Sequence, residues 1–402
     1  MDVDENGSMI GATAVGVVAI AVLWTLWILR PNAHAPVEFI FHPSSVLHRR
    51  IVETGLTQAY VPPWYATNAH VQLFMFCLLP QVDVHTYDRE LVAMEDGGQV
   101  ALDWIASTLP PSAPIVLVLH TLAGCSQDMR EFCHAATSSG YRAVVFNKRG
   151  HGQSKLTTPR LQAFGCTSDM KAVLAHVQST FPGVPVVGTT CPFNFNDGEA
   201  ASRVGVGYSA GAGLLSSYLG EMGQHSKLAA GVLVSPGYQH YMVHATSTSP
   251  SHFHAQGGLH PLYNYLMAKS LQTLLAPHHA MLASYIDLPA ANAASCMADF
   301  DQAVYVKLHA FESLAEYWKA SDPLRDVHNI AVPTLFLSAK DDPVCPTRLI
   351  DVGIVDRNPY IMLAFTSHGS HCGFYEHKHG RLQSWAPTAA LAYLDHVLGR
   401  TL

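Results

Sequence analysis

The stretch Arg203-Val-Gly-Val-Gly-Tyr-Ser209-Ala-Gly-Ala-Gly-Leu-Leu-Ser-Ser-Tyr-Leu219 decides the fold that we expect for this chain. Arg203–Tyr208 has the apolar character of a buried strand, and Ala210–Leu219 has the small, apolar residues of a closely packed helix. Ser209 stands between them in a match to GxSxG, which is typical of a nucleophile elbow on a strained strand-to-helix turn. An ordinary tight turn is the alternative interpretation.

Apolar runs alternate with helical patterns on both sides of this stretch. Ile115–His120 is continuously apolar, as expected of a strand that is buried on both faces. The other predicted strands are Tyr87–Met94, Gln99–Trp104, Ala143–Asn147, Ala229–Ser235, Thr334–Ala339 and Ile361–Thr366, and the other predicted helices are 127–139, Cys166–Phe181 and Pro387–Leu398. This alternation predicts an α/β fold with a mostly parallel central sheet and helices on both faces.

The remaining segments suggest the domain organisation. Residues 30–85 are rich in proline and aromatic side chains, show no strong period, and are interpreted as an irregular lead-in. Residues 86–235 and 327–402 form the expected core, and 236–326, which has no clear strand pattern, is interpreted as a helical cap inserted between two strands. Gly188–Ser202 is polar and turn-forming and is interpreted as a surface loop, with an artefact of the gene model as the alternative interpretation.

The N-terminal region predicts a single-pass membrane anchor. After a tail at residues 1–8, Met9–Leu29 has 21 residues without a charge, enough for a helix of about 31 Å, the thickness of a bilayer core. A cleaved signal peptide or a buried helix is the alternative, but the tail is acidic where a signal peptide is basic. Arg30, Arg49 and Arg50 follow the segment, so the positive-inside rule places the catalytic part on the cytoplasmic side.

Composition excludes several classes of protein. Only 13% of the 402 residues are charged and 49% are hydrophobic, which excludes a disordered chain. The net charge of −7, without a basic stripe, argues against a nucleic-acid partner. The eight cysteines form no CxxC pair and are expected to be reduced thiols. Oligomeric state is not predicted.

The 24 histidines raise the question of a metal enzyme. Histidine is dense at His252-Phe-His254, at His278-His279, and from His368 through His371 to His377-Lys-His379. None of these stretches is an HExxH motif or a Cys/His zinc pattern, and solvated loop histidines explain them. We therefore predict no metal site and no cofactor, with metal catalysis as the minor alternative.

A serine nucleophile requires a base and an acid, and on such a sheet they follow the serine in the order acid, then histidine. Asp341 and Asp342 both follow the predicted strand Thr334–Ala339, so either is a candidate for the acid. His368 and His371 both follow the last strand. Gly369 and Gly373 lie two residues to either side of His371 and would let the loop bring its ring close to Ser209, so His371 is preferred.

The oxyanion of an acyl-transfer intermediate needs backbone donors. The N-terminus of the helix after Ser209 offers one, the N–H of Ala210. The loop His120-Thr-Leu-Ala-Gly124 follows the first long parallel strand and would offer the N–H of Leu122. A plain strand-end loop is the alternative interpretation of this segment.

Taken together these features resemble the α/β-hydrolase superfamily over about residues 60–398. More narrowly, the chain resembles the membrane-anchored subfamily of YheT-like hydrolases, abhydrolase-domain type 1 and type 3 proteins, and yeast medium-chain ethyl-ester synthases. The motifs that carry the resemblance are Asp96-Gly-Gly98 with Asp103-Trp104, Phe146-Asn-Lys-Arg-Gly150, Leu156-Thr-Thr-Pro-Arg160, Asp299-Phe-Asp301, and Thr366 to Phe374.

The resemblance implies Ser209 as nucleophile, Asp342 as acid and His371 as base. Pro346 stands four residues after Asp342, the spacing usual in such hydrolases, and this selects Asp342 over Asp341. The implied reaction is hydrolysis of acyl-lipid esters such as phospholipids or monoacylglycerols at a membrane, without a cofactor. Thr121, Ala210 and Ser370 stand where the family usually has glycine, methionine and glycine.

Two other functions use the same sequence features. An alcohol acyltransferase would share every catalytic residue and would make medium-chain fatty acid esters, so only its product distinguishes it from a hydrolase. A catalytically inactive membrane interaction protein on a hydrolase fold is the alternative from another class. Because serine, aspartate and histidine are all present at the expected positions, an enzyme is the preferred interpretation.

Overall fold

The computed structural model of the chain describes residues 35–54, 56, 60–79, 86–182, 203–237, 261–378 and 380–400. The expected anchor, Met9–Leu29, and the expected loop, Gly188–Ser202, lie outside these ranges. Within these ranges, no helix is both long enough and apolar enough to cross a membrane.

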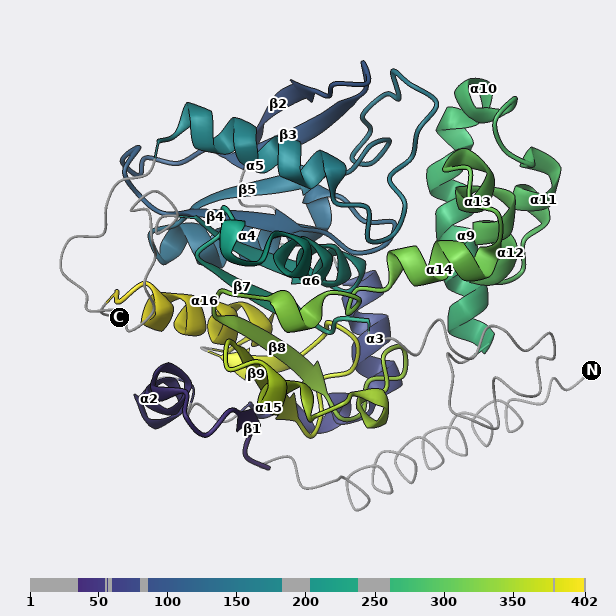
Figure 1. Ribbon diagram of the computed structural model, residues 1–402. Coiled ribbons are helices and arrows are strands. Elements are labelled where there is room, and N and C mark those ends of the chain that lie inside the picture. The colour runs from purple at the N-terminus through teal and green to yellow at the C-terminus, as the bar shows by residue number, and fades with distance from the viewer. Residues whose placement is uncertain are drawn as a thin grey trace, which may run out of the picture.

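A nine-stranded sheet forms the centre of the molecule, in the order β1-β9-β8-β7-β6-β4-β5-β3-β2 (Figure 1). The six strands from β9 to β5 in this order are parallel. At the edges, β1 pairs antiparallel with β9, β3 pairs antiparallel with β5, and β2 pairs antiparallel with β3. The predicted mostly parallel sheet is therefore confirmed. The strands are β1 (Glu38–Phe41), β2 (Tyr87–Ala93), β3 (Gln99–Ile105), β4 (Ile115–Leu119), β5 (Arg142–Asn147), β6 (Arg203–Tyr208), β7 (Ala230–Val234), β8 (Thr334–Ala339) and β9 (Ile361–Thr366).

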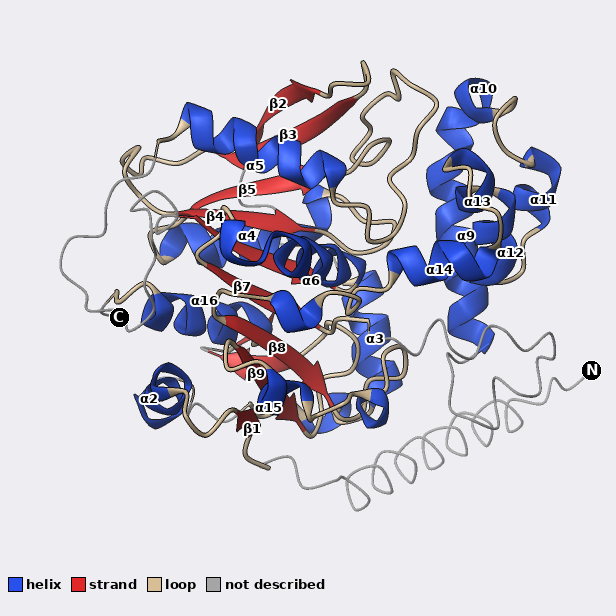
Figure 2. Ribbon diagram, viewed as in Figure 1, coloured by secondary structure: helices blue, strands red, loops and turns tan. Residues whose placement is uncertain are grey.

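Helices cover both faces of this sheet (Figure 2). One hydrophobic cluster packs the sheet against α2 (Val46–Thr54), α4 (Arg130–Ser138) and α16 (Ala386–Val397). A second cluster packs the opposite face against α5 (Ser168–Thr180), α6 (Ala210–Met222) and α15 (Ile354–Arg357). Side chains alternate along each strand, so Val116 of β4 joins the first cluster and Leu117 joins the second. Every residue of β4 is buried, as its continuous apolar run predicts.

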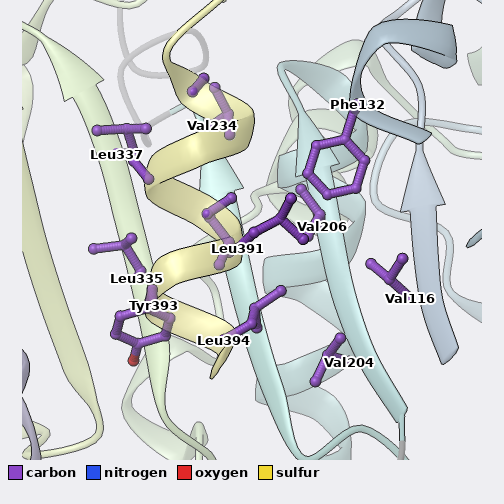
Figure 3. Close-up of a cluster of buried hydrophobic side chains, with 14 of the residues drawn as sticks. Val116, Phe132, Val204, Val206, Val234, Leu335, Leu337, Leu391, Tyr393 and Leu394 are labelled. Atoms are coloured by element: carbon purple, nitrogen blue, oxygen red, sulfur yellow. The ribbon is translucent and has the colours of Figure 1, made fainter. Parts of the chain in front are cut away.

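The first of these clusters shows how α16 closes the core (Figure 3). Leu391 and Leu394 lie on the face of α16 that points to the sheet, next to Val206, Val234 and Leu337. Burying one such side chain contributes roughly 1.5–3 kcal/mol. These contacts hold the last helix against the sheet.

Helices fill the connection between β7 and β8. Among its described residues, 235–237 and 261–333, no strand occurs. A separate hydrophobic cluster holds this helical segment together and includes Leu156 and Leu161 from the loop after β5. The helices are α9 (Pro261–Leu275), α10 (His279–Leu282), α11 (Leu288–Ala293), α12 (Met297–Ala303), α13 (Tyr305–Leu308) and α14 (Leu314–Ser321).

The lead-in is more regular than we predicted from the sequence. It contributes β1 to the sheet edge, α2 to one face, the short 3-10 helix η1 (Trp64–Ala66) and the helix α3 (Ala69–Leu78). The side chain of Asn68 caps α3 by accepting hydrogen bonds from the next backbone N–H groups. The prediction failed because β1 has only four residues and α3 is apolar almost all round, so neither shows a clear period.

A short hairpin after β9 was also not predicted. It consists of β10 (Tyr375–Lys378) and β11 (Arg381–Ser384), which pair with each other and not with the main sheet. Most of its side chains are polar and only partly buried, so the sequence carries no hydrophobic alternation that would indicate strands.

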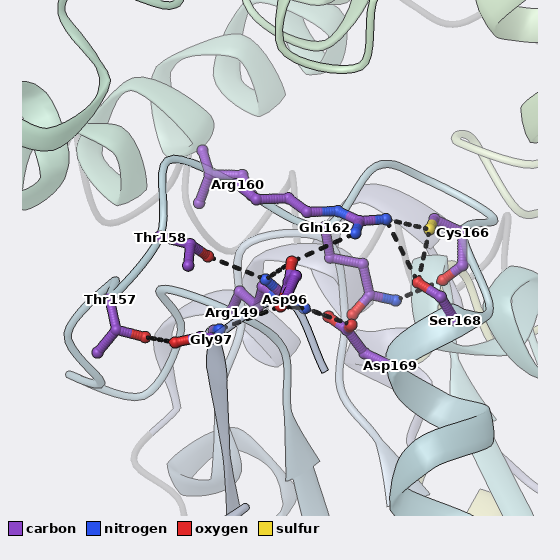
Figure 4. Close-up of polar contacts among 12 residues, drawn as sticks. Asp96, Gly97, Arg149, Thr157, Thr158, Arg160, Gln162, Cys166, Ser168 and Asp169 are labelled. Carbon is purple, nitrogen blue, oxygen red and sulfur yellow. Dashed lines mark hydrogen bonds and ion pairs between the residues drawn. The ribbon is translucent and has the colours of Figure 1, made fainter. Parts of the chain in front are cut away.

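A buried ion-pair network fixes the loop between β5 and α5 (Figure 4). The Arg149 side chain is 2% exposed and binds the carboxylates of Asp169 and Asp96, each through two hydrogen bonds of 2.7–2.9 Å. This guanidinium lowers the pKa of Asp96 to about 2. A Cβ at Gly98 would lie 2.2 Å from an Arg149 nitrogen, so a larger residue there would displace this guanidinium. Three sequence motifs thus meet at one arginine, since Arg149 of the Phe146–Gly150 motif also binds Asp96 of the hairpin turn and Thr158 of the Leu156–Arg160 motif.

Replacing Arg149 with methionine is expected to lower the free energy of unfolding by about 3–5 kcal/mol, because the buried Asp169 carboxylate loses its counter-charge. Urea denaturation measures this change. Arg160→Met is the matched control, since the Arg160 side chain is 36% exposed and its pair with Asp96 is worth at most about 1 kcal/mol. Equal losses in the two variants would contradict this account.

Candidate active site

Ser209 lies on the sharp turn between β6 and α6. Its backbone has φ of +53°, a region that non-glycine residues rarely adopt, so the residue is strained. A Cβ at Gly207 would lie 2.5 Å from the Gly211 carbonyl oxygen, and one at Gly211 would lie 2.3 Å from the Leu119 carbonyl oxygen. Both glycines are therefore required by close backbone packing, as the elbow motif predicts.

Ser209 is hydrogen-bonded to His371, and His371 to Asp342. The His371 Nε2 lies 2.7 Å from the Ser209 Oγ, and the His371 Nδ1 lies 2.8 Å from the Asp342 Oδ2. The other oxygen of Asp342 accepts hydrogen bonds from the backbone N–H groups of Val344 and Cys345. Asp342 is thereby held as an acceptor, and it orients the ring so that Nδ1–H faces the carboxylate and Nε2 faces the serine.

The protonated form of His371 is favoured by its surroundings. Burial lowers the pKa of the ring, but the negative charge of Asp342 and the hydrogen bond to it are among the causes that raise that pKa well above its ordinary value. A histidine in this environment can accept a proton from Ser209 and hold it, because the imidazolium is paired with a buried carboxylate.

The competing pair, Asp341 and His368, lies beside these residues but has other contacts. Asp341 Oδ1 accepts a hydrogen bond of 2.9 Å from the backbone N–H of Ser370. Its Oδ2 lies 3.6 Å from the His368 Nδ1. Asp341 thus supports the loop that carries His371, and the structure joins Asp342, not Asp341, to the histidine that contacts the serine.

The loop that carries His371 is tightly wound. Gly369 has φ of +144°, and a Cβ there would lie 2.6 Å from the Phe374 ring. Ser370, Cys372 and Phe374 also have positive φ values. The Ser235 hydroxyl accepts a hydrogen bond from the Cys372 backbone N–H, which ties this loop to the end of β7. The role of Ser235 was not predicted, since strand ends carry no sequence signal for such a contact.

The two predicted oxyanion donors come from elements that touch each other. Ala210 is the first residue of α6, where a backbone N–H has no partner within the helix. Leu122 lies in the loop after β4, whose Leu119 and His120 carbonyl groups are in close contact with Gly211 of α6. The loop and the helix N-terminus are thus brought together beside Ser209.

Lys148 contacts the same loop, and sequence reasoning had assigned it no role. Its Nζ donates hydrogen bonds to the carbonyl oxygens of Thr121 at 3.3 Å and Leu122 at 3.2 Å. Loss of hydration lowers the pKa of the amine to about 7. His120 completes the arrangement, because its Nδ1–H donates to the Thr121 carbonyl while its Nε2 accepts from the Lys148 backbone N–H.

The possibility of a metal site can be examined for the part of the chain that the structure describes. There, the one group of three potential ligands with atoms within 4.8 Å of one another is Asp342, Cys345 and His371. Asp342 and His371 are already bound to each other in it. The segment with His252 and His254 lies outside the described residues. His278 donates a hydrogen bond from its Nε2–H to the Gly150 carbonyl oxygen.

The chain is similar in sequence to a known family and to several known proteins. A family model described as "Alpha/beta hydrolase family" matches residues 115–381. Phospholipase ABHD3 from Mus musculus is 28% identical over 329 residues, which cover 80% of this chain and 74% of that protein. Monoacylglycerol lipase ABHD2 from Homo sapiens is 26% identical over 387 residues, covering 90% and 85%. Protein ABHD15 from Homo sapiens is 29% identical over 324 residues, covering 77% and 63%.

Proposed function

Because this chain belongs to the alpha/beta hydrolase family, we propose that it is a membrane-anchored serine hydrolase that cleaves carboxylic esters of acyl lipids. The observation that carries the proposal is the hydrogen-bonded series from Ser209 through His371 to Asp342 at a strained elbow. Such an arrangement activates a serine hydroxyl for attack on an acyl carbonyl.

The proposed reaction has two halves. As the Ser209 Oγ attacks the ester carbonyl, the His371 Nε2 takes its proton, and the N–H groups of Leu122 and Ala210 bind the oxyanion. His371 then gives the proton to the leaving alcohol, and an acyl-enzyme remains. Water then attacks this intermediate while His371 takes its proton, and His371 returns that proton to the Ser209 Oγ as the acyl bond breaks and the fatty acid leaves.

The lipid class is proposed from the relatives, two of which are named as a phospholipase and a monoacylglycerol lipase. The proposed anchor, Met9–Leu29, would hold the enzyme at the surface where acyl esters reside. Arg30, Arg49 and Arg50 favour the cytoplasmic side for the catalytic part.

A panel of monoacylglycerols and phospholipids, incubated with the wild type and with Ser209→Ala, tests the proposal. We expect release of free fatty acid that depends on Ser209. A parallel series with added medium-chain alcohol distinguishes acyl transfer, which would form a new ester instead. The proposal fails if no lipid is cleaved in a Ser209-dependent way and a fluorophosphonate does not label the wild type.

Lys148 is expected to position the oxyanion loop. In a trans peptide the N–H points opposite to the C=O, so the bond from Lys148 to the Thr121 carbonyl fixes the direction of the Leu122 N–H. Lys148→Met should lower kcat by about tenfold to a hundredfold and leave KM nearly unchanged, because the oxyanion exists only after attack on the carbonyl. Steady-state kinetics on a soluble ester measure both constants.

The stability of the same variant separates positioning from folding. The folded-state pKa of Lys148 is about 7, below its ordinary value of 10.5, so the unfolded chain binds more protons between these values. The buried Lys148 charge therefore lowers the free energy of unfolding by its full amount below about pH 7. This destabilisation disappears as the pH rises toward 10.5. Lys148→Met should accordingly be at least as stable as the wild type at pH 7. A loss of activity that merely follows a loss of stability would contradict a positioning role.

A further inference from the structure

The region around α3 is unusually apolar for an exposed part of a protein. The 29 residues from Thr54 to Val82 contain no Asp, Glu, Lys or Arg. A helix that is apolar all round is expected to be buried. Yet Phe74 is 52% exposed and Leu78 is 74% exposed. We call the exposed apolar residues of η1 and α3 the α3 surface; they are Trp64, Tyr65, Val71, Phe74, Leu78 and Leu79.

These side chains gather on one side of the helix. Val71, Phe74 and Leu78 follow a spacing of three and four residues, which places them along one helical face. Gln72 and Leu73, on the other side, are buried. A stripe of this kind normally packs against another element of the same fold, and here it is exposed.

The N-terminal part of α9 extends the apolar area. Tyr263 of α9 is hydrogen-bonded to His70 of α3, and it packs with Leu73 of the same helix. Leu262, Tyr265 and Leu266 of α9 are each 45–48% exposed. Together, α9 and the α3 surface hold nine of the fourteen large hydrophobic side chains that are exposed in the described part of the chain.

The α3 surface adjoins the candidate active site. The Ser370 hydroxyl, one residue before His371, donates a hydrogen bond of 2.6 Å to the Ala69 carbonyl at the start of α3. The Gln72 side chain accepts a hydrogen bond from the Tyr375 backbone N–H, just after the loop that carries His371. The helix that presents the apolar face is thus bound to both ends of the segment that presents the catalytic histidine.

The first described strand, β1, also begins at the edge of the sheet near the candidate active site. Glu38, the first residue of β1, pairs with Phe365 near the carboxyl end of β9, the edge from which the loop with His371 leaves the sheet. Eight residues, 30–37, separate Glu38 from Leu29, the end of the proposed anchor, and the nine Cα-to-Cα steps between these two residues can span at most about 32 Å. An anchor in a bilayer would therefore keep the bilayer close to the edge of the sheet that carries the active site.

We propose that the α3 surface lies on the lipid bilayer and docks the active site against it, in addition to the N-terminal anchor. The inference deepens and rests on the proposed function, a hydrolase of acyl lipids. Trp64 and Tyr65 supply the aromatic side chains that favour the headgroup region, and α3, with ten residues, is too short to span the membrane. Because no charged residue lies between Thr54 and Val82, the surface binds zwitterionic phospholipid and does not require anionic lipid.

An environment-sensitive fluorophore tests the contact without reference to activity. The full chain carries the probe on Leu78→Cys, or on Leu91→Cys as the matched control, since Leu91 is also an exposed leucine, at 56%, but lies on β2 at the other sheet edge. Both variants carry Cys77→Ser, because Cys77 is an exposed native thiol, and labelled Cys77→Ser alone gives the background. Phosphatidylcholine vesicles are then added, with and without bromine on the acyl chains.

The probe at position 78 should brighten severalfold with vesicles and be quenched by the brominated acyl chains, also in 0.5 M salt, where surface charge is screened. The probe at position 91 should not respond. The proposal is overturned if position 78 does not respond, or if both positions respond equally. The proposal is also overturned if the probe at position 78 is already shielded from water without lipid. Shielding that dilution reverses would show that a second copy of the chain covers the surface. Shielding that dilution does not reverse would show that another segment of the same chain covers it.

A kinetic readout links the surface to the reaction. We expect Leu78→Ser to lower the ratio of the rate on a vesicle-borne ester to the rate on a soluble ester by at least tenfold, and Leu91→Ser to leave it unchanged. Equal ratios in both variants would overturn the inference. If the wild type cleaves neither ester, the proposed function fails, whereas the fluorescence result still decides whether the surface contacts lipid.

Discussion

Ser209→Ala is expected to reduce kcat for ester hydrolysis by about four to six orders of magnitude, because among the described residues no other hydroxyl is hydrogen-bonded to the His371 Nε2 to replace the attacking oxygen. His371→Ala should have an effect of similar size, since the serine then lacks its base. The two losses should not add in the double variant, because the residues act as one unit. Single-turnover release of a chromogenic alcohol from a soluble ester measures them.

Two controls make this result specific. Both variants should keep the thermal unfolding temperature of the wild type within a few degrees. For Ser209→Ala the reason is that alanine removes only a hydroxyl from an already strained turn. His368→Ala is the matched histidine control, since His368 is also buried but lies beside Asp341 and not beside Ser209. Retained turnover in Ser209→Ala, or an equal loss in His368→Ala, would contradict the assignment of the nucleophile and base.

Asp342→Asn should lower kcat by about a thousandfold to ten-thousandfold, and Asp341→Asn by less than tenfold. The asparagine amide at 342 can donate to the His371 Nδ1, which moves the ring proton to Nε2, where it prevents the ring from accepting a proton from Ser209. At position 341 the amide oxygen can still accept the hydrogen bond from the Ser370 backbone N–H. The two variants therefore make the same chemical change at adjacent positions, so Asp341→Asn is the matched control for Asp342→Asn.

The same soluble ester and the same unfolding measurement serve for these variants. A severe loss in Asp341→Asn with a mild loss in Asp342→Asn would exchange the two roles. Equal severe losses accompanied by unfolding would show that the loop, not the acid, had been disturbed. Only a severe loss in a folded Asp342→Asn, beside a mild loss in a folded Asp341→Asn, supports the acid role of Asp342.

Local patterns predicted much of the core. The continuous apolar run of β4 and the small residues around Ser209 act through near neighbours, and the structure has the strand, turn and helix there. The resemblance to abhydrolase-domain proteins is confirmed by the family match and the relatives. In contrast, β1 and α3 were not predicted, because one is four residues long and the other lacks a polar face.

The motifs that carried the resemblance had no physical explanation at the level of sequence. The structure shows that Asp96, Gly98, Arg149 and Thr158 meet in one network, although more than fifty residues separate the first from the third. Lys148, next to Arg149, turns the other way to the oxyanion loop. No spacing rule predicts that Lys148 and Arg149 have different partners, because their partners depend on the side of the turn to which each side chain points.

The sequence by itself determined the α/β alternation, the elbow at Ser209 and a short list of partners, because hydrophobic period, glycine and turn residues act over a few neighbours along the chain. It placed two adjacent aspartates and two nearby histidines after the expected strands, and preferred His371 for its flanking glycines and Asp342 only through the family resemblance. Only the tertiary structure showed that Asp342 is bonded to His371 and His371 to Ser209, and that an apolar helix lies exposed beside them. The reason is that a hydrogen bond between residues 162 positions apart, or the absence of a cover over Leu78 within the described residues, depends on how distant elements pack.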